Sequence, residues 1–228
     1  YNGSIANINI NDVETIDILK DASAAAVYGS RSANGVLLIT TKKGKSKKPV
    51  VSFSGYTGFQ DMINNPMRVM NAEEFAVRLL DWVKEVLRKG AMQNYNVSIQ
   101  GSANSTSYYF SGSYSNIEGI QLNDNFKRIT LHMNLDSKVN DWLTFGVNTS
   151  YSYRDNSGIP ASLASARVAS PLANNYIGKP NYDIYLSGEL FQPYPLVNLY
   201  IDNSNISNEL FAVGSAKVKV PWIQGLQY

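Results

Sequence analysis

Hydrophobic and polar residues alternate along much of the chain after residue 49. In five segments apolar residues recur at alternate positions, with an occasional Gly or Thr among them, whereas most of the residues between are Ser, Asn, Thr, Gln or charged. The apolar positions are Val51, Phe53 and Phe59; Tyr95, Val97 and Ile99; Tyr108, Phe110 and Tyr114; Ile129, Leu131, Met133 and Leu135; and Leu143, Phe145, Val147, Tyr151 and Tyr153. A period of two predicts β-strands with one apolar and one polar face. Within residues 106–115, Tyr109 is the one aromatic residue on the polar side, and a weaker sixth segment covers residues 210–220.

The connections between these segments alternate in length. Residues 101–105, 140–141 and 221–225 form short links, whereas residues 61–92, 116–126 and 154–209 form long ones, and residues 225–228 begin a seventh segment. Segments of about 9 to 12 residues with short turns at one end and long loops at the other are typical of transmembrane β-barrels. A β-sandwich whose apolar faces meet would show the same alternation, so periodicity alone leaves both folds open.

The first 48 residues follow a different pattern. Residues 13–20 are rich in β-formers, Asp21 precedes an Ala-rich run that ends at Gly29, and residues 36–41 form a compact apolar run. An Asp at the start and a Gly after the end favour a short helix over residues 21–28. The predicted order is strand, helix, strand, followed by a basic run at residues 42–48 that we interpret as a solvated linker.

A further helix is indicated within the first long connection. Residues 71–89 place Phe75, Leu79, Val83 and Val86 on one face, with Gly90 behind them. This spacing predicts one amphipathic helix, and two short helices are the alternative.

Composition excludes several classes of protein. The chain of 228 residues carries 20 Lys and Arg against 18 Asp and Glu, which gives a formal charge of +2, and it has no Cys. A protein that binds nucleic acid through its phosphates needs a basic face, and here the basic run is local, so no nucleic-acid partner is expected. No stretch of about 18 apolar residues is present, and no export signal opens the sequence, so any such signal is expected outside it.

Catalytic and metal sites are not expected. His132 is the single His, which excludes a His-based triad and a multi-His metal site, and it is expected on the polar face. Glu73 and Glu74 are adjacent at a helix start, where solvated carboxylates are the ordinary case. We therefore predict that the protein is not an enzyme and uses no metal or cofactor.

The segment VETIDILKDASAAAVYGSRSANGVLLITTKKGK resembles the C-terminal half of the plug domain of TonB-dependent outer-membrane transporters. Within that superfamily it is similar to the SusC/RagA family of nutrient importers. The resemblance continues through QNYNVSIQGS and RITLHMNLDSKVNDWLTFGVNTSYSY. The plug signature residues are Asp21, Tyr28, Gly29, Arg31, Asn34 and Gly35.

The resemblance implies a mainly β fold, namely a transmembrane antiparallel β-barrel with a small α/β plug segment. This family's barrel has 22 strands, so the chain would be a fragment. Residues 1–44 would be the C-terminal half of the plug, residues 45–49 a linker, and residues 50–228 the first six or seven barrel strands with long extracellular loops. Gly29 and Gly35 in this segment are each expected to lie in a turn.

The resemblance also implies a function and partners. It implies import of oligosaccharides or peptides across the bacterial outer membrane, together with a SusD-like surface lipoprotein and the TonB-ExbB-ExbD complex, in contact with outer-membrane lipid. Tyr182, Tyr185 and Tyr194 in the last long connection are candidates for stacking on substrate, with loop packing as the alternative. Arg31 is a candidate for an ion pair between plug and barrel wall. Two other hypotheses are a soluble or cell-surface β-sandwich that binds glycans, and the same fold with a siderophore or cobalamin as cargo.

Overall fold

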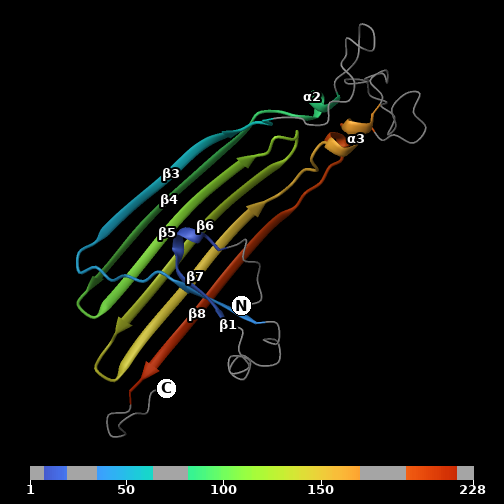
Figure 1. Cartoon of the computed structure of the whole chain (residues 1–228). Coiled ribbons are helices and arrows are strands. Elements are labelled where there is room, and N and C mark those ends of the chain that lie inside the picture. Colours follow the sequence, from blue (N-terminus) through green and yellow to red (C-terminus); the bar gives the residue numbers. More distant parts are fainter. Residues whose placement is uncertain (1–7, 20–34, 64–81, 170–193, 220–228) are drawn as a thin grey trace.

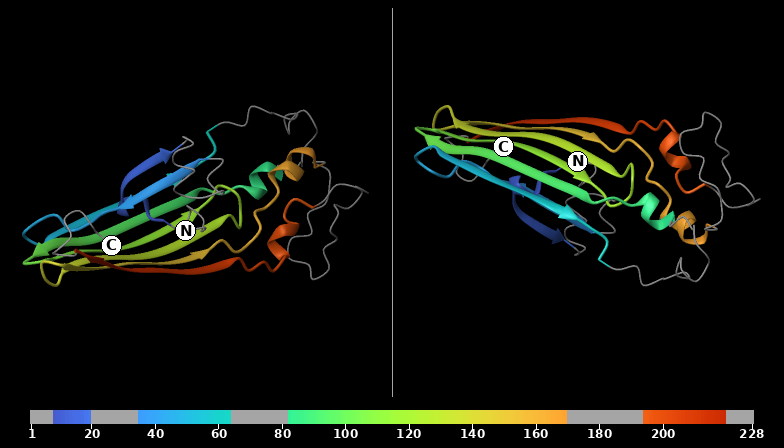
Figure 2. Two further views of the ribbon diagram at one scale, coloured as in Figure 1. Left: turned by 90° about the horizontal axis from the view of Figure 1, so that it is seen from below. Right: turned by 90° about the horizontal axis from the view of Figure 1, so that it is seen from above.

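The computed structural model describes residues 8–19, 35–63, 82–169 and 194–219 (Figure 1). This part of the chain is mainly β. Two sheets are present, a two-stranded hairpin near the N-terminus and a single six-stranded antiparallel sheet. The hairpin lies against one face of the larger sheet, as both views in Figure 2 show.

The six-stranded sheet follows the order of the sequence. Its strands are β3 (Val50–Gln60), β4 (Gly90–Ala103), β5 (Thr106–Glu118), β6 (Asn125–Lys138), β7 (Leu143–Asp155) and β8 (Ile206–Val218). The first six predicted strands are found, and β4 to β8 run to 13 or 14 residues, longer than the alternating segments predicted. The predicted start of a seventh strand at residues 225–228 lies outside the described residues. The strands extend because their pairing continues through polar residues at both ends, where the alternation fades.

Cross-strand register separates apolar from polar residues row by row. One row consists of Phe53, Val97, Gly112, Leu131, Tyr151 and Leu210. The next row, on the opposite side, consists of Ser54, Asn96, Ser113, Thr130, Ser152 and Glu209. We call the two sides of the sheet the apolar face and the polar face. Successive side chains of a strand point to opposite faces, so the alternation in the sequence becomes two continuous surfaces.

Short turns gather at one end of the sheet, the turn end, and long connections at the other, the loop end (Figure 1). Residues 104–105 join β4 to β5, with Asn104 in the left-handed region at φ 54°. At residues 139–142 the Asn140 side chain accepts hydrogen bonds from the backbone N–H groups of Trp142 and Leu143. The loop of residues 119–124 is shorter than predicted, because β5 and β6 extend into it.

The N-terminal hairpin consists of β1 (Val13–Leu19) and β2 (Val36–Thr41), which pair antiparallel after a 3₁₀ turn η2 (Ile10–Asp12). These bounds confirm both predicted strands. Gly35 precedes β2 with φ +97°, a conformation that favours glycine, in agreement with its predicted turn role. The predicted helix at residues 21–28 lies outside the described residues, as do Asp21, Tyr28, Gly29, Arg31 and Asn34.

Short helices lie at the loop end. They are α2 (Trp82–Val86), α3 (Leu163–Val168) and the 3₁₀ turn η4 (Val197–Tyr200). The single helix predicted to reach Lys89 is wrong at its C-terminal end, because α2 ends at Val86 and Leu87 instead forms a β-bridge with Gln121. Residues 71–81 lie outside the described part. Among the described helices, none has the length and apolar character needed to cross a membrane.

The buried apolar core is small and lies at the loop end. Its members are Trp82, Val86, Ala161, Ala166, Tyr194 and Leu196. A sandwich would instead place its core against the apolar face, yet Phe53 is 73% exposed and Leu131 is 53% exposed in the part of the chain described here. Within the described residues no second layer covers this face.

Candidate functional site

Burial is inverted in the six-stranded sheet. On the polar face Thr130 is 4% exposed and Asn134 is 5% exposed, whereas the large side chains of the apolar face remain open. In a water-soluble domain the reverse arrangement is usual. The face that is covered is therefore the polar one, and the hairpin of β1 and β2 covers it (Figure 2).

Two buried hydrogen bonds join the start of the hairpin to the polar face. Asn9 Nδ2 donates to Asn96 Oδ1 of β4 at 2.9 Å, and the Tyr109 hydroxyl of β5 donates to Asp12 Oδ1 at 2.9 Å. Asn9 also accepts from the backbone N–H of Asn11 and so caps the 3₁₀ turn that carries Asp12. The turn thus positions both polar groups toward the sheet.

Contacts continue along the second strand of the hairpin and the linker. Asn148 Nδ2 of β7 donates to Thr41 Oγ1 at 3.3 Å, and Lys43 Nζ pairs with Asp136 Oδ2 of β6 at 2.6 Å. Lys45 pairs with Glu14 of β1. Two lysines of the basic run therefore have carboxylate partners, while their side chains remain exposed to solvent, as expected for a solvated linker.

The linker also lies close to the turn end of the sheet. The backbone N–H of Ser102 donates to the Ser46 carbonyl at 2.6 Å. A Cβ on Gly44 would lie 2.2 Å from the Gly101 carbonyl oxygen and 2.3 Å from that of Tyr108, so only glycine fits there without a backbone shift. This close approach fixes where the chain crosses β4 and β5.

His132 lies on the polar face, as predicted. It is buried, and its ring centroid is 6.0 Å from that of Tyr109. The ring thus packs beside the Tyr109–Asp12 bond. Within the described residues no group of three or more His, Asp or Glu side chains is placed to hold a metal ion.

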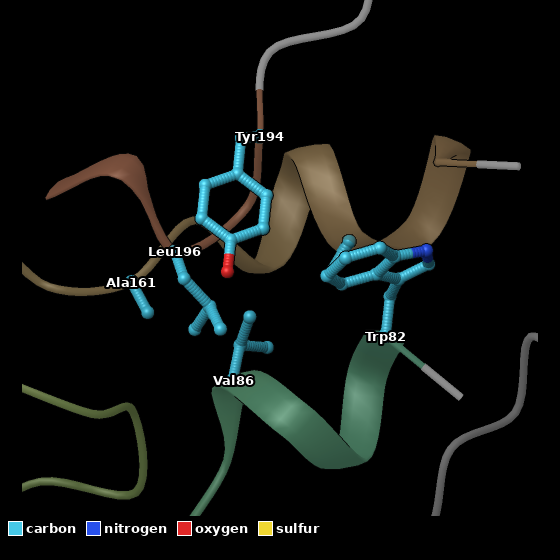
Figure 3. Packing of buried hydrophobic residues seen from close by; sticks show 6 residues of the cluster. Trp82, Val86, Ala161, Tyr194 and Leu196 are labelled. Atoms are coloured by element: carbon cyan, nitrogen blue, oxygen red, sulfur yellow. The ribbon is translucent and has the colours of Figure 1, made fainter. Parts of the chain in front are cut away.

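The loop end contains a second organised region, which we call the loop cluster, formed by the core residues named above. Trp82 of α2 and Tyr194 meet edge to face, with ring centroids 5.7 Å apart and an interplanar angle of 85° (Figure 3). Val86 and Leu196 fill the space beside them (Figure 3). Burial, and then the nearby Tyr200 and Glu85, raise the pKa of Tyr194 to about 12. The connection before β4 and the connection between β7 and β8 are therefore held together.

The predicted substrate aromatics have different outcomes. Tyr194 is 3% exposed and packs on Trp82, which favours the loop-packing alternative over stacking on a substrate. Tyr182 and Tyr185 lie outside the described residues. Asn9, Asp12 and Asn96 were not singled out from the sequence, and the one signal that pointed to this contact was Tyr109 on the otherwise polar side of residues 106–115.

These features define a mainly β protein with an apolar face open to its surroundings and a polar face that holds a docked hairpin. No protein-family model matches the chain. The TonB-dependent receptor P26 of Formosa agariphila is 37% identical over 178 residues, which are 68% of this chain and 18% of that receptor. The TonB-dependent receptor SusC of Bacteroides thetaiotaomicron is 31% identical over 198 residues, 78% of this chain and 20% of that receptor.

A solved structure of a related transporter has a similar fold. The RagAB peptide importer in its closed-closed state matches with a TM-score of 0.73 at 22% identity, over 97% of this chain and 32% of that chain. The chain is a SusC/RagA-like segment of a TonB-dependent receptor. It spans about a fifth of the length of the curated relatives it matches. Those relatives are receptors, which confirms the prediction that the chain is not an enzyme.

Proposed function

We propose that the protein belongs to a TonB-dependent importer of the bacterial outer membrane, in which the six-stranded sheet is one section of a 22-stranded β-barrel. The observation that carries this proposal is the inverted burial. A surface of Phe, Val and Leu side chains is stable against hydrocarbon, and a polar surface is stable against a wet interior. Strands of 13 or 14 residues exceed the length needed to cross a bilayer at a tilt.

An aromatic row supports this orientation. Tyr95 and Tyr114 are cross-strand partners on the apolar face, toward the loop end, and Tyr153 lies in the same row on the far side of Ile129. Amphipathic rings of this kind form girdles at the two membrane interfaces of barrels. The loop end would then face the cell exterior and the turn end the periplasm.

The hairpin would be part of the plug. In this proposal residues 1–44 form the C-terminal half of the plug, residues 45–49 the linker and residues 50–228 the first barrel strands. The buried bonds from Asn9 and Asp12 to the polar face support a plug element that rests on the inside of the wall. Arg31 keeps its proposed role in an ion pair between plug and wall.

The cargo would be an oligosaccharide or a peptide. A SusD-like lipoprotein would close over the loop end, and TonB-ExbB-ExbD would transmit force to the plug so that it rearranges and opens a path. The name of the RagAB structure describes a peptide importer, which supports the peptide option. A strain that lacks the gene for this protein can be grown on defined oligosaccharides, peptides, siderophores or cobalamin. The nutrient on which its growth fails identifies the cargo and tests the siderophore or cobalamin alternative.

The membrane assignment is tested with matched Lys substitutions in the complete natural protein, refolded into lipid bilayers. Leu131→Lys places a charge at the middle of the apolar face, and Gln93→Lys places one beyond the Tyr row toward the loop end. We expect a loss of stability of about 2–4 kcal/mol for Leu131→Lys and about 0–1 kcal/mol for Gln93→Lys, measured by denaturant titration. Equal effects, or a protein that stays folded and monomeric without detergent, would contradict the assignment and favour the sandwich.

A further inference from the structure

Two hollows lie one above the other on the apolar face of the sheet. The first is a groove of about 730 Å³ at the loop end, where β5, β6 and β7 meet residues 199–203. Asn116, Lys127 and Asp155 line it from the strands, and Tyr200 and Asp202 line it from the loop. These strand positions follow Tyr114, Ile129 and Tyr153 on the same face, so the groove begins just beyond the aromatic row.

Hydrogen bonds hold the walls of this groove in place. The backbone N–H of Gly158 donates to the Asn203 carbonyl at 3.0 Å, and that of Asn156 donates to the Asn205 carbonyl at 2.9 Å. The side chain of Asn123 donates to the Ile159 carbonyl at 3.2 Å. Preformed walls lower the cost of ordering a bound molecule.

The lining suits a partner that is rich in hydroxyl groups. Lys127 contributes +1, while Glu118, Asp155 and Asp202 contribute −3, so the formal charge of the lining is −2. A negative groove repels phosphate, whereas carboxylate and amide oxygens accept hydrogen bonds from hydroxyls. Tyr200 is 43% exposed and adds an aromatic surface beside these acceptors. This combination favours a saccharide over an anionic group.

The second hollow is apolar, has a volume of about 700 Å³ and lies nearer the middle of the sheet. It surrounds Gly112, whose missing side chain leaves a notch between Val97, Phe110 and Leu131. A Cβ at Gly112 would be in ordinary contact, 3.4 Å from Leu131 Cδ2. From Gly112 to Asn116 the strand rises by roughly 13 Å, so one amphiphilic molecule can reach both hollows.

We propose that this pair of hollows binds a glycolipid, with the saccharide headgroup in the groove and an acyl chain in the Gly112 notch. The inference rests on the proposed membrane function. The binding site would lie on the membrane-facing surface of the barrel, separate from the path of the cargo. The aromatic row between the hollows lies where headgroup and chain of such a lipid join.

The test uses the complete natural protein in nanodiscs of phosphatidylcholine that contain a minor fraction of glucosyl diacylglycerol. Native mass spectrometry counts the glucosyl lipids retained per protein. Phosphatidylglycerol with the same chains replaces the glycolipid in a second arm, and free maltose is added to the detergent-solubilised protein in a third. Gly112→Leu fills the notch, and Asn116→Leu removes a polar group from the groove.

Each variant has a matched control on the same face. Gly214→Leu adds the same side chain where nothing lies within 4 Å of the new Cβ. Gln93→Leu changes the cross-strand partner of Asn116, which does not line the groove. We expect about fivefold less retained glucosyl lipid for Gly112→Leu and for Asn116→Leu, and less than about a twofold change for the controls.

Three results would overturn the inference. Equal retention of phosphatidylglycerol would remove the preference for a saccharide headgroup. Binding of free maltose that is unchanged in Gly112→Leu would identify a site for soluble sugar. Equal losses in the control variants would show a general effect on the wall. A protein that does not enter the nanodisc would overturn the proposed function as well, whereas insertion without glycolipid preference would overturn this inference alone.

Discussion

The hydroxyl of Tyr109 donates a hydrogen bond to Asp12 Oδ1 at 2.9 Å across 97 residues of sequence. Both side chains are buried, and the bond joins the middle of the sheet to the turn that begins the hairpin. A carboxylate in such a place needs a donor, because an unpaired buried charge is costly. Tyr109 therefore has a specific reason to occupy the polar face.

Removal of this hydroxyl should loosen the hairpin from the sheet. In Tyr109→Phe the Asp12 carboxylate loses its donor, and we expect a loss of about 1–3 kcal/mol in the stability of hairpin docking. Hydrogen exchange of the β1 and β2 amides in the complete protein measures this. Tyr108→Phe removes a hydroxyl from the other face and is the control. Unchanged protection of the hairpin in Tyr109→Phe would contradict the role given to this bond.

Gly44→Ala should displace the linker from the turn end. The new Cβ would meet backbone atoms of Gly101 and Tyr108, which cannot move aside as a side chain tip can. We expect a cost of about 1–3 kcal/mol, as for overpacking elsewhere in proteins. Gly214→Ala adds the same methyl group in open space and should have little effect. Thermal unfolding of both variants in the same detergent compares them, and equal midpoints would argue against the close approach.

Trp82→Ala should open the loop cluster and leave the sheet intact. The Trp82 ring packs edge to face on Tyr194, and truncation of a buried Trp costs about 3–5 kcal/mol. Limited proteolysis should then cut within residues 156–205 faster, while the circular dichroism of the sheet is unchanged. Val168→Ala alters an exposed side chain of α3 and serves as the control. Loss of the whole β signal would indicate that the loop cluster is required for folding.

Alkaline pH should weaken the same cluster. The pKa of Tyr194 is raised from 10.0 to about 12 in the folded protein. Stability from the neutral phenol is therefore complete below pH 10 and is lost as the pH rises through 12. Tyrosinate absorbance, taken as the difference between wild type and Tyr194→Phe, should show a group that ionises near pH 12. A difference titration centred near pH 10 would mean that Tyr194 is exposed.

Much of the sheet was predictable because its physics is local. The face of the sheet on which Leu131 lies can be predicted from the apolar residues two positions before and after it. This period of two predicted both the strands and the face to which each side chain points. The strand ends were less predictable, since Glu118 and Asn125 pair across the sheet without an apolar signal. Residues 36–41 were assigned correctly because a compact β-branched run ends there at a basic segment.

The contacts that build the candidate site were harder to predict because they join distant segments. Nothing near Asn9 in the sequence indicates that it meets Asn96, and Trp82 meets Tyr194 only after two distant connections fold together. Tyr109 gave a partial signal as an aromatic residue among polar ones. Its partner depends on the path of the hairpin, which no local pattern encodes.

The outermost strands of the described sheet carry a practical consequence for work with this segment. β3 and β8 are each hydrogen-bonded on one side only, so both borders present bare amide and carbonyl groups. Water can solvate the unpaired backbone groups of these edge strands but not the apolar face of the sheet. Hydrocarbon can solvate the apolar face but not the backbone groups. We therefore expect these six strands, when produced without any further strands, to pair through the edges β3 and β8 of different copies and to aggregate.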